Sequence, residues 1–563
     1  MFNAGIGIDN FRELIELKRV YVDKTKSIKS IVGDDYPKVS LFTRPRRFGK
    51  TLTLNMLEEF FDVTKSSREL FSNLYIAKHQ DICAEWMNQY PVINISLKQI
   101  NKINYARALA NFAIIISQIC LNNNFLLNSS KVDADDRQLL EIFKRRGADE
   151  TDLGQSLYVL CRALNYHFEK PCILLIDEYD VPLNYAWQHN YYQEMLDFIR
   201  DLFGFALKGN QYLKFAILTG CLRISKESIF TGVNNFKCFT ISDEKYSDTF
   251  GFTKNEVENL LEMAEFGHKK AEIKAWYDGY TFGTNTEIYC PWDVINYLYD
   301  LNDNPNLPPQ PYWLNSSSND LIKNFPDHLN FDYKNKLQIL LDHGAIKCTL
   351  SSDMTYENIY TSESDFWNLL YATGYLTKTR DLELTHYQHS YSNQIWLRIP
   401  NAAIETIFVN SVAKWFQDEM KVYDRKKLLQ AFWSGDGQKF TEIISSILIN
   451  TISFYDYHEN FYHAFLIGLF SSLPYSVTSN LESGLGRVDI LVMDSVQNPK
   501  RGACIELKKA ENDQESLEEK ALQALKQIQK NKYNAPLLYR KLSVINWGIA
   551  FYKKECLAKS QVL

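Results

Sequence analysis

Two groups of residues in this chain have types and spacings that could do chemistry on phosphates. The first is Gly49-Lys50-Thr51, which follows an apolar stretch and precedes a helical pattern. Backbone N–H groups at a helix start, helped by the helix dipole, can hold phosphate oxygens. In such a loop Lys50 would reach the β- and γ-phosphates of a nucleotide, and the Thr51 hydroxyl would ligate Mg²⁺.

The complete phosphate-loop pattern is G-x-x-x-x-G-K-[ST], and here Arg44 stands at its first glycine. That position often needs a backbone freedom that Arg lacks. A Gly-Lys-Thr triplet on its own is a weak signal, and a chance helix start is the alternative. Arg46 and Arg47 could serve phosphates or a neighbouring subunit. The residues expected to surround the nucleotide are Arg44, Arg46, Arg47, Phe48, Gly49, Lys50, Thr51 and Leu52.

An apolar strand that ends in adjacent carboxylates, Asp177 and Glu178, strengthens this interpretation. Asp177 would hold Mg²⁺ through water or through Thr51, and Glu178 would polarise the attacking water. Taken alone, the pair could be an ordinary acidic turn after a strand. Both motifs, in this order and on these elements, predict a P-loop NTPase that binds ATP and Mg²⁺.

Thr219 directly follows the next expected strand, residues 214–218. In P-loop ATPases with a catalytic glutamate, the strand after the acidic one lies between the other two. Thr219 could therefore sense the γ-phosphate, or it could be a plain strand-end hydroxyl. Arg223 could neutralise charge in the transition state, or it could be a surface residue of a loop.

The second group lies near the C-terminal end: Asp489 within an apolar strand, and Glu506 and Lys508 on the following strand. Residues two apart in a strand share a face, so Glu506 and Lys508 point the same way, and a hairpin would bring Asp489 to them. Two carboxylates that hold Mg²⁺, with a lysine beside them, are what a metal-dependent phosphodiesterase needs. Exposed strand charges are the alternative explanation.

A helix after these strands carries Gln527, which could line a path for phosphates and is a candidate catalytic residue. Lys530, Lys532 and Tyr533 follow it. Glu482 and His463 are weaker candidates, for which a structural role is the simpler explanation.

The elements that position these groups alternate between strands and helices in residues 38–241, which predicts an α/β sheet. The predicted fold is a P-loop NTPase parallel sheet, a helical middle region and a C-terminal restriction-endonuclease-like α/β domain. The middle contains a hairpin-like stretch that could be a winged-helix fragment or a plain connector. The expected boundaries are 1–245 for the ATPase-like domain, 246–320 for a lid or helical extension, 321–455 for the connector and 456–563 for the nuclease-like domain.

Composition limits the partners. The chain of 563 residues has a formal charge of −6, which excludes a globally basic nucleic-acid coat. Residues 475–563 nevertheless hold 14 Lys and Arg against 10 Asp and Glu, so this end could tolerate a polyanion. The ten cysteines are scattered without a CxxC pair, which favours reduced thiols. No apolar run approaches the ~18 residues of a membrane span, and we expect a cytoplasmic protein with no membrane partner.

The motifs together resemble the prokaryotic AAA-ATPase-like proteins that have a C-terminal PD-(D/E)XK nuclease domain. This resemblance implies ATP for the front half and metal-dependent cleavage of nucleic acid for the back half. It also makes Arg44 in place of the first glycine look like the family's own pattern. The matching stretches are 21–25, 41–51, 175–183, 218–230, 276–280, 312–320 and 486–490, with 506–508.

The favoured function is an ATP-hydrolysing protein coupled to a Mg²⁺-dependent nuclease, with DNA as the favoured substrate. One alternative is an ATP-dependent signalling switch whose last domain binds a partner or nucleic acid without cutting it. The other is an ATPase joined to an unrelated interaction module. Self-association into a homo-oligomer stays open.

Overall fold

The structure is a computed structural model, and the chain divides into two compact units. The first contains residues 1–317 and 347–403, and the second contains residues 318–346 and 404–563. The boundaries expected from the sequence at 245, 320 and 455 stay predictions. The residues that the structure describes are 2–223, 236–315, 333–350, 362–379, 394–419, 425–451, 459–471, 475–483, 486–510, 512 and 515–563.

A parallel five-stranded sheet in the order β2-β3-β4-β1-β5 forms the centre of the first unit. Strands β1 and β3 are buried along their whole length, as expected where helices cover both faces of a sheet. The position of β4 between β3 and β1 confirms the order expected from the sequence. The strands are β1 (Val39–Thr43), β2 (Val92–Ser96), β3 (Cys172–Asp177), β4 (Leu213–Gly220) and β5 (Phe236–Phe239).

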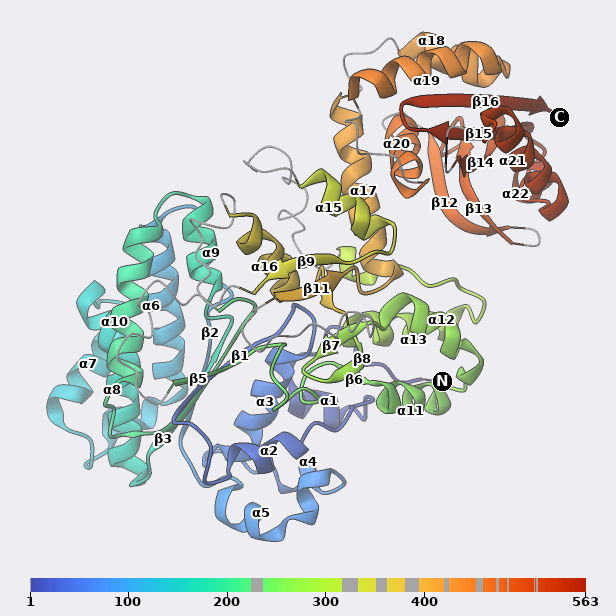
Figure 1. Ribbon diagram of the computed structural model, residues 1–563. Coiled ribbons are helices and arrows are strands. Elements are labelled where there is room, and N and C mark those ends of the chain that lie inside the picture. Colours follow the sequence, from blue (N-terminus) through green and yellow to red (C-terminus); the bar gives the residue numbers. More distant parts are fainter. Residues whose placement is uncertain are drawn as a thin grey trace. The chain divides into compact units, whose positions relative to one another are not determined.

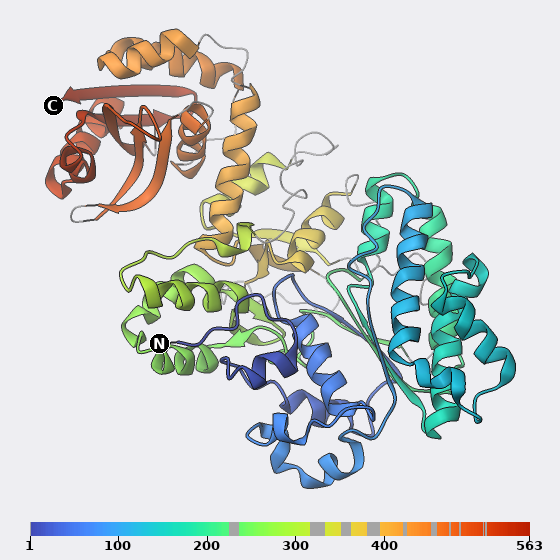
Figure 2. The same cartoon turned by 180° about the vertical axis from the view of Figure 1, so that it is seen from behind.

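Helices α6, α8 and α10 cover one face of this sheet and α3 lies on the other (Figures 1 and 2). Side chains cap two of the covering helices: Asn104 accepts from the Arg107 amide at the start of α6, and Asp149 caps α8. The helices of this part are α1 (Phe11–Glu16), α2 (Lys26–Ile31), α3 (Lys50–Phe61), α4 (Arg68–Phe71), α5 (Gln80–Trp86), α6 (Tyr105–Asn122), α7 (Ala134–Lys144), α8 (Glu150–Phe168), α9 (Val181–Gln188) and α10 (Tyr192–Leu207).

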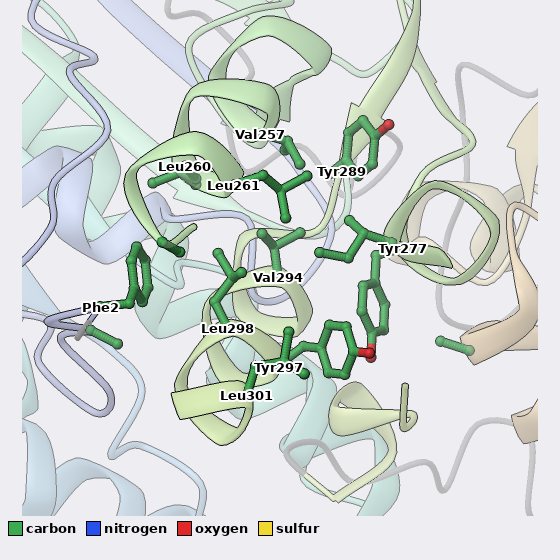
Figure 3. Packing of buried hydrophobic residues seen from close by; sticks show 14 residues of the cluster. Phe2, Val257, Leu260, Leu261, Tyr277, Tyr289, Val294, Tyr297, Leu298 and Leu301 are labelled. Atoms are coloured by element: carbon green, nitrogen blue, oxygen red, sulfur yellow. The ribbon is translucent and has the colours of Figure 1, made fainter. Parts of the chain in front are cut away.

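A second, smaller core of the first unit packs helices α11, α12 and α13 beside a three-stranded sheet, β6-β8-β7. Figure 3 shows the N-terminal Phe2 inserted among residues of these helices. A capping box at Thr253 and Glu256 starts α11. The elements are β6 (Phe252–Thr253), α11 (Lys254–Met263), α12 (Lys270–Tyr277), β7 (Tyr280–Phe282), β8 (Asn285–Tyr289), α13 (Pro291–Asp303) and the 3-10 turn η4 (Tyr312–Asn315).

The hairpin-like stretch expected in the middle of the chain forms β10 and β11, which pair antiparallel. Together with β9 they make a three-stranded sheet, and α16 precedes β10. These elements are β9 (Ile346–Thr349), α16 (Glu363–Thr373), β10 (Thr377–Lys378) and β11 (Gln394–Arg398).

The second unit is built on a mixed sheet in the order β12-β13-β14-β15-β16, in which only β14 and β15 run parallel. Helix α20 lies on one side of this sheet, and α21 and α22 lie on the other (Figures 1 and 2). This is the α/β domain expected at the C-terminal end. Its strands are β12 (Ser476–Ser483), β13 (Gly486–Met493), β14 (Arg501–Lys509), β15 (Ser543–Tyr552) and β16 (Glu555–Val562).

The helices of the second unit include a group that precedes the sheet in sequence, and in this group α19 packs against β16. Across the described ranges, no helix has the length and apolar character needed to cross a bilayer. The helices are α15 (Lys334–Leu341), α17 (Ala402–Glu419), α18 (Arg425–Ser434), α19 (Gly437–Thr451), α20 (Glu459–Ser471), α21 (Leu517–Asn531) and α22 (Ala535–Tyr539).

Candidate functional sites

The loop between β1 and α3 contains the residues expected from the sequence to bind phosphate. Left-handed conformations occur at Arg47 (φ 69°) and at Gly49 (φ 82°), directly before α3 begins at Lys50. Arg44, which replaces the first glycine of the motif, does not have a positive φ. This loop therefore needs no glycine at position 44, which removes the concern raised by the sequence.

The Lys50 ammonium lies inside the loop. It is buried and donates to the carbonyl oxygens of Arg44 and Pro45, each at 3.0 Å, with the Cys221 sulfur 3.6 Å away. Both carbonyls belong to the loop itself, so the Lys50 ammonium is held within the loop. The N–H groups at the start of α3 add a positive potential at the same place.

Asp177, at the end of β3, accepts hydrogen bonds from two threonine hydroxyls. Thr51 donates to one carboxylate oxygen at 2.6 Å and Thr219 donates to the other at 2.5 Å. All three side chains offer oxygen atoms that can be metal ligands. The buried Asp177 and Thr219 lie at the carboxyl ends of β3 and β4. Because hard cations prefer oxygen ligands, this cluster fits Mg²⁺ beside a nucleotide. The Thr219 hydroxyl is therefore hydrogen-bonded to Asp177, and its contact with a γ-phosphate stays a prediction.

Glu178 follows Asp177 in a left-handed conformation, with φ 53°. Few residues other than glycine adopt this conformation, and it costs free energy that the surrounding fold must supply. Burial raises the pKa of Glu178, and the charges of Asp177 and Asp180 add to this effect, while Lys50 opposes it. A carboxyl group with a raised pKa is better suited to accept a proton from water than an ordinary one.

Three residues that the sequence interpretation did not assign hold the loop after β4. The Asp180 carboxylate accepts from the amides of Cys221 and Leu222 at 2.9 and 3.0 Å, and the Tyr179 hydroxyl donates to the Leu222 carbonyl at 2.6 Å. A side chain at Gly220 would lie 2.7 Å from the Tyr179 ring. Asp180 directly follows the acidic strand in sequence, but its partners lie about forty positions away, so no local pattern reveals them.

The other arginines expected near the nucleotide have different surroundings. The Arg44 guanidinium is buried and donates to the carbonyls of Thr43, Phe239 and Tyr246, and burial lowers its pKa to about 10. Its side chain is therefore committed to the protein interior, and only its backbone can take part in binding phosphate. Arg47 stacks over Trp292, with its guanidinium carbon 4.2 Å from the ring centroid.

The remaining residues expected at the nucleotide differ in their contacts and in how far their side chains are exposed. The Arg46 carbonyl accepts from the Trp313 indole at 3.3 Å. Phe48 is buried against Tyr280, and Leu52 is half-buried. Arg223 is exposed, and the following residues 224–235, which include the end of the 218–230 match, lie outside the described part of the chain. Residues 316–320 of the 312–320 match also lie outside it.

The second candidate site is on the face of the C-terminal sheet that α21 covers. The antiparallel pairing of β13 with β14 ends at Ile490 and Ile505, and Asp489 and Glu506 are the next residues of the two strands beyond that pair. Asp489 also accepts from the Leu507 amide at 2.8 Å. The Lys508 ammonium lies 3.3 Å from a Glu506 oxygen. The structure thus brings together the three residues selected from the sequence.

Glu506 is the most unusual carboxylate of this group. It is 2% exposed, and its second oxygen, Oε2, has no hydrogen-bond partner among the described residues. Burial, together with the charge of Asp489, raises the pKa of Glu506 to about 7, although Lys508 opposes the shift. Burial likewise raises the pKa of Asp489. A buried carboxylate oxygen without a donor is costly unless a cation satisfies it.

These residues therefore fit a divalent cation of the Mg²⁺ type. Among the described residues, no group of three or more His, Cys, Asp or Glu side chains is placed to hold a metal ion. Mg²⁺ is often bound by one or two carboxylates, with water and substrate phosphates as its other ligands. Asp489 and Glu506 match that pattern.

The weaker candidates have distinct places in the structure. The His463 ring nitrogen Nε2 lies 3.0 Å from the Asp489 carbonyl oxygen, which joins α20 to β13, and burial lowers the pKa of His463. Gln527 donates to the Tyr533 hydroxyl at 3.4 Å, and Asn531 donates to the same hydroxyl at 2.8 Å. Gln527 thus contacts Tyr533, and no described hydrogen bond joins it to the carboxylates. Glu482 pairs with Arg487 through the backbone of β12 and β13.

Comparison with known proteins gives a separate family match for the part of the chain that holds each candidate site. Residues 5–230 match a family model described as predicted AAA-ATPase, and residues 457–561 match a model of the PD-(D/E)XK nuclease superfamily. The chain is also similar to an uncharacterized protein encoded in the 5′ region of vnfD in Azotobacter chroococcum. The two are 25% identical over 504 residues, which cover 87% of this chain and 86% of the relative.

Proposed function

Because residues 5–230 are an AAA-ATPase-like domain and residues 457–561 are a PD-(D/E)XK nuclease-superfamily domain, we propose that this protein hydrolyses ATP and cuts nucleic acid with Mg²⁺. DNA is the proposed substrate. The observation that carries the nuclease proposal is the buried Glu506 oxygen Oε2, which has no hydrogen-bond partner in the described part of the chain, because such an oxygen calls for a cation.

At the ATP site, Lys50 would turn from the loop carbonyls to the phosphates, and Thr51 and Asp177 would hold Mg²⁺. Glu178 would accept the proton of the attacking water. Lys50→Ala is expected to weaken ATP binding by about tenfold or more, because a charge-assisted hydrogen bond is lost. Glu178→Gln should keep binding and stop hydrolysis.

Isothermal titration with ATP and a phosphate-release assay measure these two effects. The matched control is Lys29→Ala, which removes an exposed lysine from α2. If Lys50→Ala binds ATP as tightly as the control, the ATP-site assignment is wrong.

At the C-terminal site, Asp489 and Glu506 would hold the metal, and the Lys508 ammonium would donate to a phosphate oxygen and stabilise the charge that develops there. Bound Mg²⁺ supplies a lowered pKa for its water and charge stabilisation for the phosphate. Asp489 is fixed for this role because its carboxylate also accepts from the Leu507 amide.

Cleavage of labelled substrates tests the nuclease proposal. Linear and circular duplex DNA, circular single-stranded DNA and RNA should be incubated with the full chain and Mg²⁺, with and without ATP. Asp489→Ala and Lys508→Ala should each lower the cleavage rate about a hundredfold or more, because each removes a group that stabilises the transition state. ATP hydrolysis should stay near the wild-type rate.

The matched control is Asp494→Ala, which removes a carboxylate that pairs with Arg501 just beyond β13. It should cut normally. Cleavage that persists in Asp489→Ala would place the activity elsewhere. A wild-type protein that cuts none of these substrates would favour an ATP-dependent switch whose last domain only binds.

A further inference from the structure

The surface around α22, on the same domain as the proposed nuclease site, is rich in positive charge. Residues 520–554 contain lysines and arginines but no aspartate or glutamate. Lys532, Arg540 and Lys541 are exposed, and no ion pair joins any of the three to a carboxylate in the part of the chain that the structure describes. Such a group of unpaired cations is complementary to a phosphate backbone.

An aromatic residue directly precedes two of these cations in the sequence. Tyr539 ends α22 and is 92% exposed, the highest value among the exposed large hydrophobic residues that the structure describes. Leu538 beside it is 47% exposed. A ring this open contributes nothing to the core, whereas every nucleobase has a face that can stack on it.

The fold holds this ring on the same face of the sheet as the proposed metal site. Leu537 packs with Cys504 and Val544, and it is the nearest side chain to Gly502. Cys504 shares its strand face with Glu506, because the two are separated by two positions in β14. From Gly502 to Glu506 is about 13 Å along the strand, a distance that a few nucleotides of one strand can cover.

We propose that Tyr539, with Lys532, Arg540 and Lys541, is a binding surface for unpaired nucleotides next to the nuclease site. The proposal rests on the proposed nuclease function and names its substrate class: nucleic acid with a single-stranded segment. In a continuous duplex, stacking between neighbouring base pairs buries the base faces that Tyr539 would contact, so such a duplex cannot use this ring. The cations would hold the backbone of the same strand.

Binding of fluorescein-labelled oligonucleotides to the full chain tests the proposal. Fluorescence anisotropy would compare a single-stranded DNA, a blunt duplex and a duplex with a single-stranded overhang, with Ca²⁺ in place of Mg²⁺ to keep the strands uncut. Tyr539→Ala should bind the single strand and the overhang about tenfold more weakly. Tyr539→Phe should bind them as the wild type does, because the stacking face is kept.

Two further variants separate stacking from charge. Arg540→Gln combined with Lys541→Gln should lower the slope of log affinity against log salt by about 1.4 on single strands, whereas Tyr539→Ala should leave that slope unchanged. Tyr299→Ala, which removes a tyrosine that is 46% exposed on α13 of the other unit, should have no effect.

Two results would overturn the proposal. If the wild type binds nucleic acid but Tyr539→Ala binds single strands equally well, the α22 surface is not the contact, and a protein partner becomes the better occupant. If the wild type binds none of the probes, the proposed nuclease function fails together with this inference.

Discussion

Asp180 shows how one buried carboxylate can organise the candidate nucleotide site. Its two backbone partners belong to the loop directly after Thr219, so Asp180 connects the end of β3 to the end of β4. Asp180→Ala leaves the N–H groups of Cys221 and Leu222 without this acceptor and should lower the free energy of unfolding by about 2 kcal/mol. Asp180→Asn keeps one acceptor oxygen and should cost less.

Urea unfolding of the full chain measures this effect. Asp197→Ala removes an exposed carboxylate from α10 and should change the free energy by less than about 0.5 kcal/mol. If Asp180→Ala and Asp197→Ala have the same stability, Asp180 does not hold the loop.

At the residue scale, the sequence was informative where chemistry follows the strand period. Glu506 and Lys508 share a face because they are two apart, and Asp489 joins them through one antiparallel register. The surroundings of Arg44 could not be predicted in this way, because its acceptors include the carbonyls of Phe239 and Tyr246, nearly two hundred positions later.

At the scale of elements, α19 packs against β16, although the match to the nuclease superfamily begins at residue 457, after α19. The Thr441 hydroxyl accepts from the Ala558 amide at 2.9 Å, and the Ser560 hydroxyl donates to the Gly435 carbonyl at 2.6 Å. Trp547 of β15 packs with Phe440, at 4.9 Å between ring centroids. Helix α19 therefore covers a strand that would otherwise be an open sheet edge.

This dependence predicts how fragments behave. A fragment of residues 425–563 should unfold cooperatively on heating, whereas residues 457–563 should melt at a lower temperature and aggregate, because β16 and Trp547 become exposed. Circular dichroism during heating, with light scattering, compares the two. Equal melting temperatures would mean that α18 and α19 add nothing to the domain.

The elements themselves were predictable to different degrees. The apolar strand expected before Glu178 corresponds to β3, and the strand expected at 214–218 corresponds to β4. The sheet β6-β8-β7 was missed within a region expected to be helical and irregular. Its strands have two, five and three residues, too few to produce an alternating pattern.

At the scale of the whole molecule, each compact unit contains one candidate site, and each site has a carboxylate that could hold a cation. Unit membership was not predictable from the sequence, because residues 347–403 belong with the first unit while residues 318–346 belong with the second. That exchange depends on tertiary contacts, which leave no local pattern of hydrophobicity. The positive charge of the C-terminal end was predictable, since it follows from composition alone.

The raised pKa of Glu506 gives the second unit a pH dependence. The carboxyl group binds its proton more tightly in the folded chain than in the unfolded chain, where its pKa has the ordinary value of 4.5. Its contribution to stability is therefore present below about pH 4.5 and is lost as the pH rises through about 7. A bound cation removes this loss because it stabilises the ionised form, so metal binding should release a proton.

Calorimetric titration of Mn²⁺ into the full chain at pH 6 and pH 8 tests the central claim, that Asp489 and Glu506 form a metal site. Since the pKa of Glu506 is about 7, the affinity should rise roughly tenfold from pH 6 to pH 8, with proton release seen in buffers of different ionisation enthalpy. Glu506→Gln should lose this binding, and Asp177→Asn, which alters the other site, should keep it. Mn²⁺ binding that is the same in Glu506→Gln and wild type at both pH values would contradict the account.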